Sequence, residues 1–192
     1  MLKYKKNLEL DSISKKYLSA IYARGYANIP KMALEQTRAE FGYFTEASDF
    51  LQCGIENKIF KFKIFNSPSE TKNLIIYLHG GAYVLRNDRQ NDRVCSKLAN
   101  KLNCNVLLLH YSLAPENKFP AAINEVSLFL NKIGSINTKI PKYENLYLFG
   151  ESSGGNLAVA SILNSNVKNL EGLILINSSL DFFSKLGLQI IW

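Results

Sequence analysis

The chain has 192 residues, of which 47% are hydrophobic and 20% charged, as in an ordinary folded chain that can bury a sizeable core. The net charge of +7 comes from positive residues scattered along the chain without a nucleic-acid motif, and no apolar run approaches the roughly 20 residues of a membrane span. We therefore expect a globular fold with no nucleic-acid partner and no membrane span.

Three cysteines, Cys53, Cys95 and Cys104, show no metal-ligand spacing and leave an odd count. They indicate reduced thiols in a cytoplasmic protein, because disulfides are rare in that compartment. The charged start of the chain, residues 1–7, has no apolar run behind it and predicts no signal peptide. We expect neither a metal ion nor a cofactor.

The order of predicted elements indicates an α/β fold. Residues 1–45 are predicted to be helical, with apolar residues at helical spacing before a break at Pro30. Strands are then predicted at 49–55, 59–65, 73–78, 105–110, 145–149 and 170–177, and helices at 88–102, 121–133 and 156–164. Two early strands followed by alternating strands and helices predict a sheet that is mixed at one edge and parallel beyond it.

A glycine-rich turn follows the predicted strand at 145–149. Gly150-Glu151-Ser152-Ser153-Gly154 has the spacing G-x-S-x-G between a strand and a helix. Such a turn strains the serine backbone, and glycines on either side remove Cβ atoms that would collide, so the hydroxyl is exposed. The backbone N–H of Ser153 then points at a developing oxyanion, aided by the positive end of the helix. Ser152 is therefore predicted to be a nucleophile in acyl transfer.

A second glycine-rich turn, His79-Gly80-Gly81-Ala82, follows the predicted strand at 73–78. Because Gly80 and Gly81 have no side chains, their backbone N–H groups can approach a substrate closely, as donors of an oxyanion hole must. We predict that these two glycines share that role with Ser153. His79 and Ala82 are predicted to support the loop, His79 by hydrogen bonding.

Three sequence blocks, in this order, carry a resemblance to a known family. They are HGGAY at 79–83, YSLAPE at 111–116 followed by FPAA at 119–122, and GESSGGNL at 150–157. Together they resemble the hormone-sensitive-lipase-like group of α/β-hydrolases over about residues 49–181. The resemblance implies a carboxylesterase or lipase of small acyl esters, with a mostly parallel sheet flanked by helices, Ser152 as nucleophile, and Gly80, Gly81 and Ser153 as oxyanion donors.

The same resemblance implies features that the sequence does not match. The family's catalytic acid and histidine lie on loops after the last two strands of its sheet, whereas no histidine follows Ser152 in this sequence. We therefore expect an incomplete, C-terminally truncated α/β-hydrolase domain at 46–192 that lacks the last two strands. Residues 1–45 are expected to form the family's N-terminal helical cap, or a helix that merely covers the sheet.

Other residues could in principle complete the catalytic set. Asp181 follows the last predicted strand and is the candidate acid, although without a histidine to orient it can do little. His110 is expected two strands away from the serine, about 9 to 10 Å in the sheet plane, which is too far for a base. Arg86 stands where the family usually has glycine, and His110 where an aspartate usually precedes the tyrosine. These two departures bear on the fit of a substrate.

Two functions remain open from the sequence. The first is a carboxylesterase that is inactive alone because the acid and the base are missing, or that is completed by a complementing C-terminal polypeptide. The second is a non-catalytic ligand-binding module on the same fold, as in plant gibberellin receptors, which resemble this family and have lost the histidine. The last predicted strand is an apolar run with no following strand to pair with, so self-association through the open sheet edge is also expected.

Overall fold

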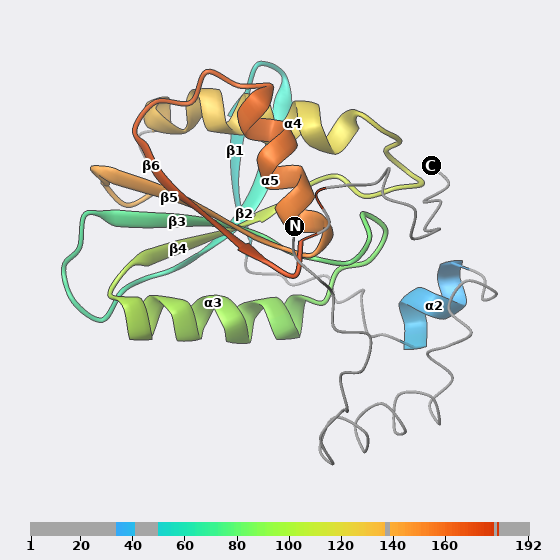
Figure 1. The fold of residues 1–192 in the computed structure, drawn as a ribbon, viewed down its shortest axis with the longest axis horizontal. Helices are drawn as coiled ribbons and strands as arrows, with labels where there is room; N and C mark the ends of the chain where they lie inside the picture. The colour runs from blue at the N-terminus through green and yellow to red at the C-terminus, as the bar shows by residue number, and fades with distance from the viewer. Residues whose placement is uncertain (1–33, 41–49, 137–138, 179, 181–192) are drawn as a thin grey trace, which may run out of the picture. The chain divides into compact units, whose positions relative to one another are not determined.

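The computed structural model describes residues 34–40, 50–136, 139–178 and 180 (Figure 1). The chain divides into two compact units, Met1–Phe41 and Gly42–Trp192. In the first unit, helix α2 (Leu34–Glu40) is described. The helical pattern before Pro30 lies outside the described residues, so the cap assigned to 1–45 stays a prediction. Asp181 also lies outside them.

The second unit is built on a six-stranded mixed sheet in the order β1-β2-β4-β3-β5-β6. The first two strands are antiparallel to each other and β2 is antiparallel to β4, whereas β4, β3, β5 and β6 run parallel. This arrangement confirms the predicted α/β sheet that is mixed at one edge. The strands are β1 (Leu51–Ile55), β2 (Lys58–Phe65), β3 (Asn73–Leu78), β4 (Asn105–His110), β5 (Asn145–Glu151) and β6 (Leu170–Ile176).

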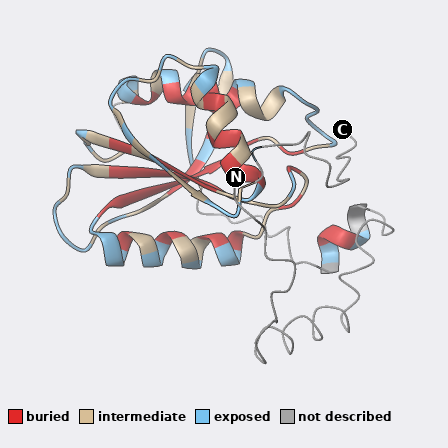
Figure 2. Ribbon diagram, viewed as in Figure 1, coloured by how far each residue is buried: buried red, intermediate tan, exposed pale blue. Residues whose placement is uncertain are grey.

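Helices cover both faces of the sheet. Helix α3 (Asp88–Leu102) packs on one face, and α4 (Ala121–Lys132) and α5 (Ser153–Leu163) pack on the other, with a short 3-10 turn, η2 (Ile133–Ser135), after α4 (Figure 1). Each face has its own apolar core. Strands β3 and β4 are almost entirely buried (Figure 2), which is why both read as unbroken apolar runs in the sequence. No helix in the described ranges is both long and apolar enough to cross a membrane.

The predicted and observed elements differ most at the start of α5. The predicted bounds of α3, β3 and β4 are confirmed, but α5 begins at Ser153 and not at Asn156. The sequence predicts that Gly154 and Gly155 belong to the turn, whereas both lie inside the helix. They are glycines because a Cβ on Gly154 would lie 2.2 Å from the Leu78 carbonyl oxygen, and one on Gly155 would lie 1.7 Å from Ser178 Oγ. Close packing of the helix against the end of β3 therefore explains Gly154, and its approach to Ser178, just after β6, explains Gly155.

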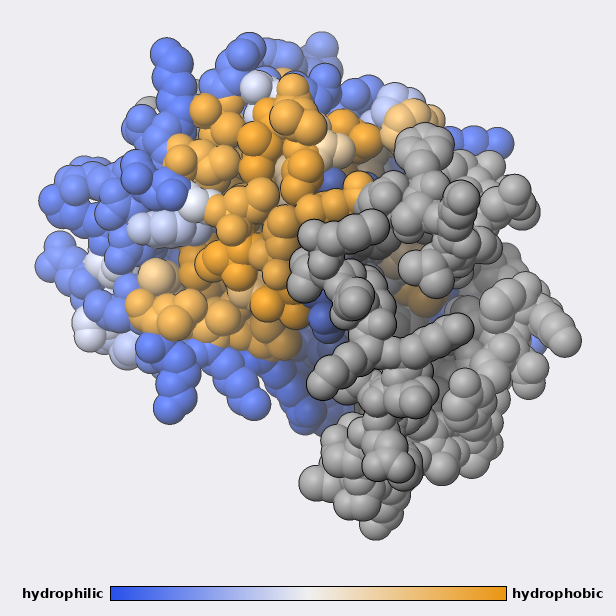
Figure 3. Space-filling model, in the orientation of Figure 1, coloured by the Kyte–Doolittle hydropathy of each residue, from blue (hydrophilic) through white to orange (hydrophobic). Residues whose placement is uncertain are grey.

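The outer side of β6 contrasts with the buried middle of the sheet. Among the described residues no strand pairs with its outer edge. Leu173 and Ile176 on β6 keep 38% and 44% of their surface exposed, and Leu163 at the end of α5 keeps 83%. Figure 3 shows apolar side chains gathered on this face of the molecule, where β6 and α5 lie.

Candidate active site

Ser152 lies in a strained turn between β5 and α5. Its backbone angles are φ 52° and ψ −121°, a region that costs a non-glycine residue on the order of 1–3 kcal/mol. The turn is held by main-chain bonds: Ser152 N donates to Ile176 O at 2.8 Å, and Gly155 N donates to Ser152 O at 3.0 Å. The serine itself is exposed. Strain of this kind persists only where the surroundings enforce it, and it is frequent at active sites.

Glycines make the close approach around Ser152 possible. A Cβ on Gly150 would lie 2.4 Å from Gly155 Cα, so the strand end and the helix start are in direct main-chain contact. A Cβ on Gly80 would lie 3.2 Å from Ser152 Cβ and 3.1 Å from the Glu151 carbonyl oxygen. The structure therefore brings Gly80 of the predicted oxyanion loop directly against the predicted nucleophile.

The loop after β3 is also strained, because two of its non-glycine residues have positive φ angles. Gly81, Ala82 and Tyr83 have positive φ angles of 128°, 52° and 63° in succession. The Gly81 carbonyl accepts hydrogen bonds from Val84 N at 3.0 Å and Leu85 N at 2.8 Å. Only a glycine fits at position 81, because a Cβ there would lie 2.1 Å from the Leu85 carbonyl oxygen. Ala82 is exposed, and it contributes to the loop through its backbone conformation.

His79 is fully buried at the base of this loop. Its Nδ1 lies 2.6 Å from the Gly80 carbonyl oxygen, which can only accept, so Nδ1 carries the hydrogen. Its ring stacks on Tyr111 with centroids 4.4 Å apart, and Tyr111 Oη donates to the His79 carbonyl at 2.7 Å. Burial lowers the pKa of His79 to about 4, so the ring is neutral at pH 7. These contacts are those expected of a bracing side chain.

Polar side chains that sequence reasoning did not assign connect the loop to its neighbours. Tyr83 Oη donates to Asn156 Oδ1 on α5, and Ala114 N donates to the Tyr83 carbonyl at 2.9 Å. Tyr111 was also given no role. Tyr83, Tyr111, Ala114 and Asn156 all lie within the three sequence blocks. The blocks could therefore have pointed to these residues, but they do not show which residue contacts which.

No base is positioned at Ser152 in the part of the chain that the structure describes. The sequence has two histidines, and the first is the buried brace at position 79. His110 lies on β4, two strands from the serine strand, as predicted. Its ring packs against Phe50 at 3.8 Å, and burial, followed by the charge of Arg86, lowers its pKa to about 2. Neither ring forms a hydrogen bond with Ser152 among the described residues.

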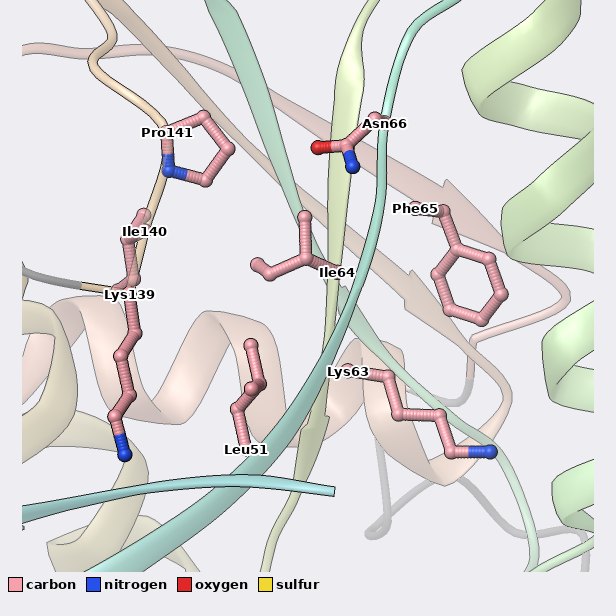
Figure 4. Close-up of a pocket in the computed structure, with 8 residues that line it drawn as sticks. All are labelled: Leu51, Lys63, Ile64, Phe65, Asn66, Lys139, Ile140 and Pro141. Carbon is pink, nitrogen blue, oxygen red and sulfur yellow. The ribbon is translucent and has the colours of Figure 1, made fainter. Parts of the chain in front are cut away.

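Cavity size alone does not locate the site. The hollow drawn in Figure 4, with a volume of about 540 Å³, lies between β1, β2 and residues 139–141 and contains none of the predicted site residues. A much smaller apolar cavity of about 40 Å³ lies beside the oxyanion loop. It is lined by Tyr83, Ser112, Ala114, Phe119 and Asn156, among others. Of the two cavities, the second is the one that adjoins the predicted site residues.

Comparison with known proteins agrees with this geometry. The model of a family described as alpha/beta hydrolase fold matches residues 75–187, more than half of the chain. The chain belongs to the α/β-hydrolase fold family. It is 32% identical over 114 residues to an arylesterase of Saccharolobus solfataricus and 35% identical over 102 residues to an acetyl esterase of Salmonella schwarzengrund. These relatives bear out the hormone-sensitive-lipase-like group that the three sequence blocks predict.

The matches cover only part of the relatives. The arylesterase alignment spans 57% of this chain and 36% of the arylesterase, and the acetyl esterase alignment spans 50% and 31%. An esterase structure from Pyrobaculum calidifontis superposes with a TM-score of 0.72 at 23% identity, covering 90% of this chain and 60% of that one. At that identity the likeness establishes the fold, and the chain spans about a third of the length of these curated relatives.

Proposed function

We propose that this chain carries the nucleophile and the oxyanion hole of a carboxylic-ester hydrolase. In this role Ser152 is acylated, the ester C–O bond breaks and the alcohol leaves with a proton. Ser152 Oγ gives its proton to a base as it attacks the ester carbonyl carbon, and the carbonyl π bond opens to leave a negative charge on the oxygen. The N–H groups of Gly80, Gly81 and Ser153 stabilise that charge. The observation that carries the proposal is the strained, exposed Ser152 with Gly80 packed against it. An incidental serine in a glycine-rich turn would need neither the strain nor the second loop.

The substrates we propose are esters with short to medium acyl chains. The relatives include an acetyl esterase and an arylesterase, and the cavity beside the oxyanion loop has a volume of only about 40 Å³. A small cavity beside the loop favours short acyl groups over long ones. Long acyl chains would require a groove that these lining residues do not form.

The base and the acid must come from elsewhere than the described residues. His79 is buried behind the loop and His110 lies on the opposite face of the sheet from α5. We therefore propose that further polypeptide, in the same chain or in a complementing one, supplies the histidine, and that the acid comes from that polypeptide or from Asp181. The free edge of β6 is the place where a further parallel strand would add. If no such strand is supplied, the alternative we propose is that the edge of β6 pairs with a second copy of the chain.

Acetylation of Ser152 tests this function directly. The chain is incubated with p-nitrophenyl acetate, and both nitrophenol release and the acetyl adduct are followed, the adduct by intact mass and peptide mapping. Loss of the histidine of a serine triad lowers kcat on the order of 10⁶-fold. We therefore expect slow formation of one adduct on Ser152, which is absent in Ser152→Ala, with turnover barely above background.

Two results would contradict the proposal. Equal labelling of wild type and Ser152→Ala would remove Ser152 as the nucleophile. Turnover above about 1 per second that depends on Ser152, within the ordinary range for enzymes, would show that this sequence already contains its base.

A non-catalytic ligand-binding module is the second candidate function. It is favoured by the observation that Ser152 has no hydrogen-bonded base among the described residues. Calorimetric titration with phenyl acetate and with acetate distinguishes the two. Binding that is unchanged in Ser152→Ala, with no adduct on Ser152, supports the module, whereas an adduct on Ser152 supports the esterase.

A further inference from the structure

Arg86 and His110, the two departures from the family pattern, meet at a single carboxylate. Arg86 Nε donates to Asp88 Oδ1 at 2.9 Å, and His110 Nε2 lies 3.6 Å from the same oxygen. The side chains of Asp88 and His110 are each 3% exposed, and that of Arg86 is 20% exposed. Because His110 is neutral, the guanidinium of Arg86 is the cation that lies against this buried carboxylate.

A second, partly buried ion pair lies on the same face of α3, with the Asp92 side chain 35% exposed. Asp92, one helical turn after Asp88, accepts a hydrogen bond from Lys63 Nζ at 2.8 Å. Lys63 is on β2, its side chain is 6% exposed, and its ammonium group lies 4.8 Å above the ring of Phe50. Figure 4 shows Lys63 and Ile64 extending to opposite sides of β2. The first turns of α3 are thus tied to the sheet through Lys63.

Arg86 connects the start of α3 to the oxyanion loop. It directly follows Leu85, whose N–H closes the turn onto the Gly81 carbonyl. The beginning of the loop is held by His79 and its middle by Tyr83, as described above. The end of the loop is held by the Arg86 side chain on Asp88, the first residue of α3. The positive φ angles of Ala82 and Tyr83 store strain that an unrestrained loop would release.

We propose that Arg86 is a positioning residue for the oxyanion loop, and that its bond to Asp88 keeps the strained turn at 81–85 closed. The catalytic consequence rests on the proposed function, because the amides so positioned are those of Gly80 and Gly81. Arg86 needs no contact with a substrate in this role. Its guanidinium acts through the main chain of the loop that precedes it.

Hydrogen exchange of the loop amides tests the positioning role without requiring any activity. In Arg86→Gln the charge is lost, in Arg86→Lys it is kept, and Arg93→Gln changes an exposed arginine on the same helix as the control. We expect the Val84 and Leu85 amides to exchange about tenfold faster in Arg86→Gln, because opening is local, with amides of β3 and β4 unchanged. Arg86→Lys should restore much of the protection, and Arg93→Gln should match wild type.

A second pair of variants separates positioning from general loss of stability. Arg86→Gln leaves the buried Asp88 carboxylate without its cation, whereas Arg86→Gln with Asp88→Asn removes both charges. We expect the double variant to unfold at a higher urea concentration than Arg86→Gln while its loop amides still exchange fast. Loop amides protected as in wild type in either variant would overturn the positioning role, as would an equal rise in exchange throughout the sheet.

Acetylation of Ser152 then reports on the proposed function separately. If Arg86 positions the oxyanion donors, the rate of adduct formation falls in Arg86→Gln and recovers in Arg86→Lys. If the Val84 and Leu85 amides exchange fast in Arg86→Gln but wild type forms no adduct on Ser152, the positioning role is supported and the esterase function is contradicted. An unchanged adduct rate despite an open loop would overturn the catalytic consequence of the inference.

Discussion

The two turns that meet at the candidate site are held by opposite means. The serine turn is stabilised by close packing that a Cβ atom would prevent: Gly150 and Gly154 lie directly against main-chain atoms, and Gly155 lies against the side chain of Ser178. The oxyanion loop is stabilised by side-chain hydrogen bonds: His79 donates to the Gly80 carbonyl within the loop, and Tyr83 donates to Asn156 on α5. An added atom should therefore destabilise the serine turn. The loss of a hydrogen bond, or the charging of a buried side chain, should destabilise the loop.

The largest expected effect comes from adding one methyl group to the serine turn. In Gly154→Ala the new Cβ would lie 2.2 Å from the Leu78 carbonyl oxygen and 2.4 Å from that of His79. Both are main-chain atoms at the end of β3, so neither can rotate away. Overpacking of this kind costs about 3 kcal/mol or more of unfolding free energy. Urea unfolding followed by circular dichroism measures the loss.

Gly54→Ala is the matched control for that change. A Cβ on Gly54, in the edge strand β1, has nothing within 4 Å, so its stability should change by less than about 1 kcal/mol. If Gly54→Ala and Gly154→Ala lose the same stability, the glycines of the serine turn are not selected by close packing.

The comparison also explains what the sequence could and could not predict. Strands β3 and β4 and helix α3 were predicted to the residue, because each combines a local apolar pattern with clear end signals. Asn87, for example, caps α3 by accepting a hydrogen bond from Gln90 N at 3.0 Å. Local pattern decides such elements without knowledge of the rest of the fold.

The misplaced start of α5 and the unassigned roles in the oxyanion loop have a different origin. Position 154 is a glycine because carbonyl oxygens at the end of β3 lie close to it. Tyr111 supports the loop because its hydroxyl group donates to the His79 carbonyl. Asp88 lies between Arg86 and His110 only once β4 and α3 pack together. Each is a contact between segments distant in the sequence, and a single sequence contains no record of such contacts.

The next effect in size distinguishes the loop by its response to pH. His79 has a pKa of about 4 in the folded chain, below its unfolded value of about 6.5, mainly because burial disfavours the charged ring. Between these values the unfolded chain binds a proton that the folded chain does not. Stability is therefore full above pH 6.5 and declines as pH falls toward 4, by about 1.4 kcal/mol per pH unit for one such histidine.

Urea unfolding of wild type and His79→Asn between pH 7 and 5 measures this slope. His110 has a lowered pKa as well and contributes in the same direction in both proteins, whereas the raised pKa of the Asp88 carboxyl contributes in the opposite direction. The difference between the two slopes comes mainly from His79, with a smaller part from its effect on the pKa of His110, and should reach about 2 kcal/mol over the range from pH 7 to pH 5. Parallel slopes would mean that His79 is accessible to protons and does not brace the loop as a neutral ring.

The smallest expected effect has the opposite sign and concerns the serine itself. Ser152 is held at φ 52° and ψ −121°, where glycine is far less strained than any residue with a Cβ. Relief of strain on the order of 1–3 kcal/mol is partly offset by the greater freedom of glycine in the unfolded chain, which costs about 0.4–1 kcal/mol. We therefore expect Ser152→Gly to be about 1 kcal/mol more stable than Ser152→Ala, which keeps the Cβ and removes only the hydroxyl group. The two proteins are compared by urea unfolding at pH 7, where both histidines are neutral in the folded chain. Equal stability of Ser152→Gly and Ser152→Ala would show that the backbone at residue 152 is not strained, and the chief structural reason for assigning the nucleophile to Ser152 would then be lost.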